Sequence, residues 1–170
     1  MVITPQSNLL MAGFARSQKA TGVHDDLHAR CIVIEGSDSV TIAMMSLALV
    51  SLSRDITEKI RDKVTEATGI PRENIMISLT HTHSGPNVEQ AGEDYTSFLI
   101  EKAAASASEA WNNRQLARIG IGSAKVMELG RNRRRLLYGG LHPDPEVGVI
   151  KIENAEGKLI GVVFNYGCHP

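Results

Sequence analysis

The chain has 170 residues, of which 42% are hydrophobic and 22% are charged. These proportions are those of an ordinary globular protein and exclude an intrinsically disordered chain. The formal net charge of −1 provides no general positive field, so charge favours neither nucleic acid nor an anionic membrane as a partner. A small molecule is therefore the expected kind of partner.

The length is that of one domain, and we predict a single domain over residues 1–170. No apolar run approaches the ~20 residues of a membrane-spanning helix, and the first residues lack the basic and apolar regions of a signal peptide. A cytoplasmic location is thus the default expectation. Cys31 and Cys168 flank apolar runs without the spacing of a metal or redox pair, and we expect two buried, reduced thiols.

The first half of the chain alternates strand and helix signals. Two apolar runs over residues 29–35 and 39–49 surround a turn-forming segment and predict a β-hairpin. Residues 53–68 follow with helical spacing of apolar residues, and Ser53 is the expected N-cap. The helix should bury one face and stop at the next glycine and proline; these residues are Ile56, Ile60, Val64 and Ala67 on the face, then Gly69 and Pro71.

The remaining elements follow the same alternation. We predict a strand over residues 74–79, an alanine-rich helix over 94–113, a strand over 118–129, a basic loop over 130–144, and a second hairpin formed by residues 146–152 and 159–166. Hairpins combined with two long helices indicate an α/β fold: a mixed β-sheet with two main helices packed on it.

Two histidines stand directly after the apolar run 74–79, in the segment THTHSGP of residues 80–86. In extended backbone the side chains of His81 and His83 would share one face, because alternate residues point the same way. Histidine binds metals and titrates near neutral pH, so the pair is a candidate metal or acid–base site. Two polar side chains on an exposed loop are the simpler interpretation.

A third histidine occupies a similar position near the end of the chain. His169 follows the predicted strand 159–166 and precedes a proline, which repeats the order of strand, histidine and proline. Zinc sites draw ligands from the ends of neighbouring strands, so two such positions favour a metal site more than either alone.

Several other residues are weaker candidates for a functional site. His24 and Asp25 are adjacent, so on an extended chain they should point apart and have a surface role. Ser84 has no third group that would make it a nucleophile, and Asp144 should cap a turn rather than bind metal. The arginine cluster and a histidine followed by a turn with two prolines should be solvated, apart from one functional arginine; these residues are Arg131, Arg133, Arg134, Arg135 and His142.

Together these segments resemble the neutral/alkaline ceramidase family. The similarity rests on motifs in the same order along nearly the whole chain, namely residues 3–5, 22–30, 80–86, 132–133 and 164–170. It corresponds to the N-terminal part of the family's catalytic domain. Members of this family are zinc-dependent amidases that cleave the N-acyl bond of ceramide, so the resemblance implies a small-molecule or lipid amide as the substrate.

The resemblance implies roles for four residues. His81 and His169 correspond to zinc ligands, His83 to a residue beside the metal-bound water or the oxyanion, and Arg133 to a residue that lines the substrate site. Zinc lowers the pKa of its bound water to about 7 and polarises a carbonyl, which suits attack on an amide. The implied cofactor is Zn²⁺.

The sequence also departs from the family pattern. The family completes the zinc site with a glutamate and a tyrosine farther along, and Ala48 stands where relatives usually carry an aspartate. If that aspartate orients a ligand, its loss should weaken zinc binding by about 10- to 100-fold. We therefore expect the intact protein to be the amidase and the 170-residue form to be inactive; the alternative is an inactive fragment or a ligand-binding pseudoenzyme.

Overall fold

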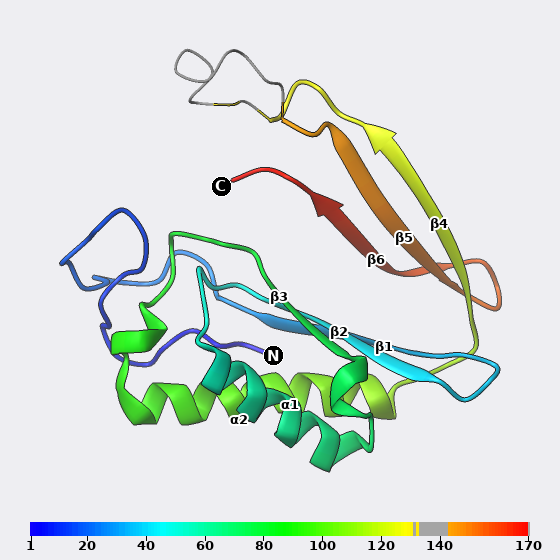
Figure 1. The fold of residues 1–170 in the computed structure, drawn as a ribbon, viewed down its shortest axis with the longest axis horizontal. Helices are drawn as coiled ribbons and strands as arrows, with labels where there is room; N and C mark the ends of the chain where they lie inside the picture. The colour runs from blue at the N-terminus through cyan, green and yellow to red at the C-terminus, as the bar shows by residue number, and fades with distance from the viewer. Residues whose placement is uncertain (131, 133–142, 170) are drawn as a thin grey trace. The chain divides into compact units, whose positions relative to one another are not determined.

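The fold is known from a computed structural model, which describes residues 1–130, 132 and 143–169 (Figure 1). The chain forms two compact units, residues 1–114 and 115–170. Each unit contains one three-stranded sheet, and both long helices belong to the first unit.

The sheet of the first unit is mixed. Strands β1 (Ala29–Glu35) and β2 (Thr41–Leu47) pair antiparallel as the predicted hairpin, and β3 (Ile75–Leu79) pairs with β2 in parallel. Because β2 and β3 run in the same direction, their last residues, Leu47 and Leu79, lie opposite one another at one edge of the sheet. The segments that follow these two strands therefore meet at this edge.

Helix α1 (Arg54–Thr68) connects the two parallel strands and has the caps that the sequence predicts. The hydroxyl of Ser53 accepts the backbone N–H of Ile56 at 3.3 Å, and Gly69 ends the helix with a left-handed φ of 75°. Ile56, Ile60 and Val64 are buried, as expected. Ala67 is exposed, however, and Thr68 is buried in its place, where its hydroxyl donates to the Val64 carbonyl at 2.7 Å.

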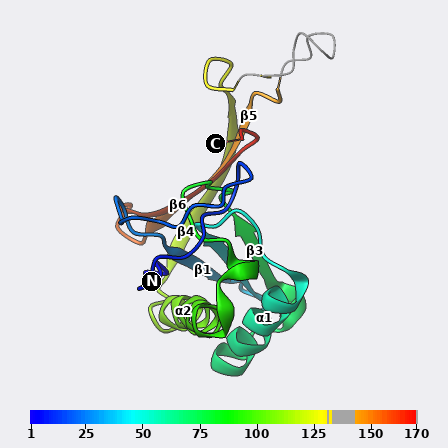
Figure 2. The same ribbon diagram turned by 90° about the vertical axis from the view of Figure 1, so that its left-hand side faces the viewer.

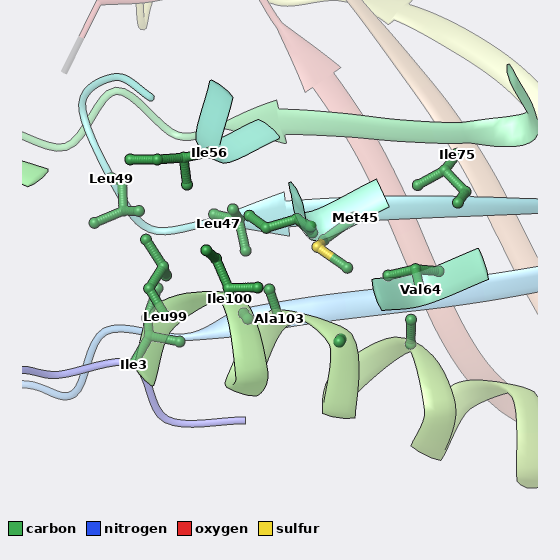
Figure 3. Close-up of a cluster of buried hydrophobic side chains, with 14 of the residues drawn as sticks. Ile3, Met45, Leu47, Leu49, Ile56, Val64, Ile75, Leu99, Ile100 and Ala103 are labelled. Atoms are coloured by element: carbon green, nitrogen blue, oxygen red, sulfur yellow. The ribbon is translucent and has the colours of Figure 1, made fainter. Parts of the chain in front are cut away.

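Helix α2 (Gly92–Asn112) packs beside α1, and both helices cover the same face of the first sheet (Figures 1 and 2). Short 3₁₀ turns, η1 (Arg72–Asn74) and η2 (Val88–Gln90), precede β3 and α2. Figure 3 shows the core between these layers, where Met45 of β2 lies close to Val64 of α1 and Leu47 of β2 lies close to Ile100 of α2. The buried residues of both helices therefore contribute to this core.

The segment before β1 is fixed to the core although it has no long strand. Ile3 is fully buried and its N–H donates to the Leu27 carbonyl at 2.8 Å. The Tyr95 hydroxyl of α2 donates to the Ile3 carbonyl at 2.9 Å, and burial raises the pKa of this phenol. These bonds hold the first loop against the edge of the first unit.

The second unit is an antiparallel sheet of β4 (Ala117–Lys125), β5 (Glu146–Asn154) and β6 (Leu159–Tyr166). The predicted hairpin of β5 and β6 is confirmed. Strand β4 ends at Lys125 rather than at the expected residue 129. Lys125 pairs with Glu146, the first residue of β5, and the prolines at 143 and 145 cannot donate the N–H groups that would extend the ladder.

The α/β class with hairpins and two main helices is confirmed, but the strands are divided between two sheets instead of one. Both cysteines are free thiols, as expected. Cys31 is half-buried, and burial raises its pKa to about 11, whereas Cys168 is exposed and not buried as the sequence suggested. Among the described residues, no helix is both long enough and apolar enough to cross a membrane.

Candidate metal and substrate site

The candidate site of the first unit lies where β2 and β3 end. The N–H of Thr80 donates to the Leu47 carbonyl at 3.1 Å, and the N–H of His81 donates to the Leu49 carbonyl at 3.0 Å. The two chain segments therefore stay paired for two residues past the end of β3. A rigid sheet edge thus positions the histidine loop, as is common for functional loops.

His81 departs from extended backbone at this point. Its φ is +58°, in the left-handed region that residues other than glycine rarely adopt. Its Nδ1 lies 2.9 Å from the carbonyl oxygen of Val50. A carbonyl can only accept, so Nδ1 is the donor in this contact, and in the neutral tautomer Nε2 then carries the lone pair. This tautomer suits a metal ligand that binds through Nε2.

The rings of His81 and His83 lie close together, with centroids 5.0 Å apart and planes inclined by 71°. The sequence prediction that the two side chains come together is thus confirmed. The expected cause, alternation of side chains along an extended strand, was wrong, because β3 ends at Leu79 and His81 has a left-handed φ. The loop conformation, rather than strand alternation, brings the rings together.

The surroundings of His83 include residues that the sequence analysis did not select. The N–H of Ala12 donates to the Gly85 carbonyl at 2.9 Å, so the segment before Gly13 runs along the histidine loop. A Cβ atom at Gly13 would lie 2.3 Å from Nδ1 of His83, and Gly13 has a φ of +78°. The Phe14 ring packs on the His83 ring, with 4.4 Å between the ring centroids. The only sequence signal was a glycine in a loop-like segment.

A pocket of about 480 Å³ lies beside the loop within the first unit. It is lined by Thr82 and Ser84, which alternate with the two histidines, and by apolar residues of the first loop such as Leu9, Met11 and Val23. The backbone N–H of Ser84 donates to the Thr82 hydroxyl at 3.2 Å, and this bond closes the loop. The pocket gives the site edge both polar and apolar walls.

The weaker candidates His24, Asp25 and Asp144 have surface or turn positions. His24 and Asp25 do not point apart: Nδ1 of His24 lies 2.6 Å from a carboxylate oxygen of Asp25, because the chain bends there. Their side chains are 98% and 88% exposed, which fits the expected surface role. Asp144 caps its turn as predicted, with the Glu146 N–H at 3.0 Å from its carboxylate.

The other predicted site residues lie outside the described part of the chain or in the second unit. Residues 131 and 133–142 lie outside the described part of the chain, and they include Arg133, the other clustered arginines and His142. His169 follows β6 and belongs to the second unit. The convergence of His81 and His169, within the roughly 3 to 4 Å that two ligands of one zinc ion require, therefore stays a prediction.

Residues 2–170 match the family described as "Neutral/alkaline non-lysosomal ceramidase, N-terminal". The chain belongs to this family. It is 29% identical to "Neutral ceramidase 3" of Arabidopsis thaliana over 148 residues, which cover 79% of this chain and 20% of that protein. It is 25% identical to "Neutral ceramidase" of Pseudomonas aeruginosa over 184 aligned positions, which cover 94% of this chain and 27% of the relative.

Solved ceramidase structures share the fold. The crystal structure of neutral ceramidase from Pseudomonas aeruginosa superimposes with a TM-score of 0.84 at 25% identity, covering 96% of this chain and 30% of that one. A structure described as "Ceramidase complexed with C2" has a TM-score of 0.83 at 24% identity and covers 29% of its chain. The chain thus spans less than a third of the length of these ceramidases.

Proposed function

We propose that this chain provides part of the active site of a zinc-dependent amide hydrolase that cleaves the N-acyl bond of ceramide or a related N-acyl compound. Membership of the ceramidase family over residues 2–170 supports the reaction class. The observation that carries the metal site is the hydrogen bond between His81 Nδ1 and the Val50 carbonyl, at 2.9 Å. It holds the imidazole in the tautomer that offers Nε2 to a cation.

His81 and His169 are the proposed zinc ligands. The nitrogen donors of imidazole suit zinc, and the His81 ring is oriented by its hydrogen bond to the Val50 carbonyl. The Val50 carbonyl orients His81, so this ring has an orienting partner although position 48 is an alanine. When bound, zinc supplies Lewis acidity to the scissile carbonyl and lowers the pKa of a water molecule.

His83 and Arg133 are the proposed substrate-contacting residues. His83 is held beside His81 by the close approach of Gly13 and by the Phe14 ring. From there its imidazole donates a hydrogen bond to the oxygen on which negative charge develops as the amide is attacked. Loss of one such donor costs about 3 kcal/mol of transition-state stabilisation. Arg133, with a permanent positive charge, is proposed to bind the same oxygen or a neighbouring polar group of the substrate.

The proposed ligand set is incomplete within this sequence. A catalytic zinc site usually has three protein ligands and water, and His81 with His169 supplies two. The relatives are several times longer than this chain, so we propose that their remaining length contributes the other ligands. The 170-residue form should then bind zinc weakly and turn over little substrate. A ligand-binding domain without catalysis is the competing function.

Hydrolysis of ceramide and of a short N-acyl amide tests the proposal. The assay compares the chain alone with the chain extended to the length of its relatives, each with added zinc and with a chelator. We expect release of the long-chain amine by the extended form only, lost with chelator, restored by zinc and abolished by His81→Asn. Val40→Asn is the control, because Val40 is 52% exposed and lies before β2, at the end of that strand away from the histidine loop. Zinc binding without hydrolysis in the extended form would instead support the ligand-binding function.

A further inference from the structure

Three consecutive residues that lie beside the histidine loop have left-handed backbone. The φ angles are 78° at Gly13, 54° at Phe14 and 47° at Ala15. Left-handed backbone costs about 1 to 2 kcal/mol for each residue with a Cβ, and neither Phe14 nor Ala15 has a polar side chain that could compensate locally. Strain of this kind collects at functional sites.

The strained turn directs one aromatic ring to the site without burying it. The Phe14 ring lies 4.4 Å from the His83 ring at an interplanar angle of 64°, yet Phe14 remains 63% exposed. The guanidinium of Arg16 lies 5.0 Å from the centroid of the same ring. Phe14 therefore contacts a charged group and the site histidine, while much of its apolar surface stays open to solvent. Burial in the core does not explain its position.

We infer that Phe14 is a specificity-determining residue, whose exposed ring surface binds the first methylene groups of the substrate's acyl chain. This inference rests on the proposed function, in which His83 donates to the amide oxygen. The acyl carbons next to that carbonyl must then pass within reach of any ring packed on His83. Phe14 is such a ring, and its open apolar surface removes those carbons from water.

A binding role and a purely supporting role for Phe14 predict different effects on activity. A ring that only holds His83 in place would change turnover equally for short and long acyl chains. A ring that binds methylene groups changes the preference between them, mainly through KM. One methylene in an apolar pocket is worth roughly 10-fold or more in specificity, so the difference is measurable.

The test compares kcat/KM for an N-acetyl amide, whose acyl group has no methylene, and for a long-acyl amide in variants of the extended enzyme. Phe14→Asn removes the apolar surface but suits left-handed backbone, so it should fold. We expect it to reduce the long-to-short ratio about tenfold, whereas Phe14→Leu and Phe14→Tyr keep the ratio within about threefold of wild type. Val40→Asn is the control, because Val40 is 52% exposed at the opposite end of β2. An unchanged ratio in Phe14→Asn, or equal losses for both substrates, overturns the inference.

Direct binding makes the result independent of turnover. N-alkyl ureas of short and long chain retain the carbonyl and resist hydrolysis, and their dissociation constants can be measured by calorimetry. Wild type should bind the long urea more tightly, and Phe14→Asn should remove most of that difference. If this pattern appears without any hydrolysis, the proposed function fails, and Phe14 is a binding residue for alkyl chains and not a determinant of substrate specificity. If hydrolysis occurs with an unchanged ratio, or if wild type shows no preference for the long urea, the inference fails.

Discussion

Nδ1 of His81 lies 2.9 Å from the carbonyl oxygen of Val50, a residue three positions past the end of β2. The bond joins the segments that follow two parallel strands, and it decides which ring nitrogen carries the proton. A backbone carbonyl cannot be removed by mutation of its side chain, so this orientation does not depend on Ala48. The relationship leads to a test that separates the stability of the loop from zinc binding.

His81→Asn should weaken zinc binding without destabilising the protein. The Asn side-chain amide can donate to the Val50 carbonyl as Nδ1 does, and Asn tolerates the φ of +58° better than histidine. His81→Gln should lose that bond and about 1 kcal/mol of unfolding free energy. Zinc affinity, measured by competition with a chromophoric chelator, should fall in both variants. Equal urea stability of the two variants would show that the Val50 bond does not matter.

Gly13→Ala should destabilise the protein more than Gly69→Ala. Both glycines are left-handed, with φ of 78° and 75°, so both variants pay about 1 kcal/mol for the backbone. Only at Gly13 does the new Cβ collide with the His83 ring, at 2.3 Å; at Gly69 it meets nothing within 4 Å. We expect a further loss of at least about 1 kcal/mol in Gly13→Ala by urea unfolding. Indistinguishable midpoints would contradict the close approach.

Leu99→Ala should be among the most damaging substitutions in the first unit. Leu99 is fully buried in the core, beside Ile3 and Leu49, so its truncation leaves a cavity that costs about 2 to 5 kcal/mol. Val40→Ala, at a residue that is 52% exposed, should change the unfolding free energy by less than about 0.5 kcal/mol. A loss below 1 kcal/mol for Leu99→Ala, measured by urea unfolding, would place Leu99 outside the core.

Stability should fall in alkaline solution because of Cys31. Burial raises the pKa of this thiol to about 11, from 9.0 in the unfolded chain. Above the lower value the unfolded chain releases a proton that the folded protein still holds, so unfolding becomes more favourable as pH rises. The stabilisation is complete below pH 9 and lost by pH 11, a change of about 2 to 3 kcal/mol. Cys31→Ala should have a flatter stability profile in this range; identical slopes would rule out the effect.

Local signals were enough to predict the elements of the first unit. Ser53 and Gly69 mark the two ends of α1 because capping and left-handed termination are decided by neighbouring residues. The end of β4 was not predictable in this way. It depends on where its partner β5 begins, at Glu146, and pairing between distant segments leaves no local mark. For the same reason the separation of the strands into two sheets was missed.

The candidate site, too, could be predicted only in part from the sequence. The positions of His81 and His83 after an apolar strand were visible in the sequence, and so was the family resemblance. The left-handed turn at Gly13 and Phe14 was not, because Phe14 has no preference for that backbone and is forced into it by surrounding contacts. The pairing of His24 with Asp25 was also missed, because a bend replaces the extended backbone that was assumed there.

The central claim is that His81 and His169 bind one zinc ion. X-ray absorption at the zinc edge tests it most directly, on the zinc-loaded protein and on the variants His81→Asn, His169→Asn and His24→Asn. We predict imidazole scattering with zinc–nitrogen distances of about 2.0 to 2.1 Å, reduced by one imidazole in each of the first two variants and unchanged in the third. A spectrum without imidazole scattering, or one that neither the His81 nor the His169 variant alters, would contradict the account.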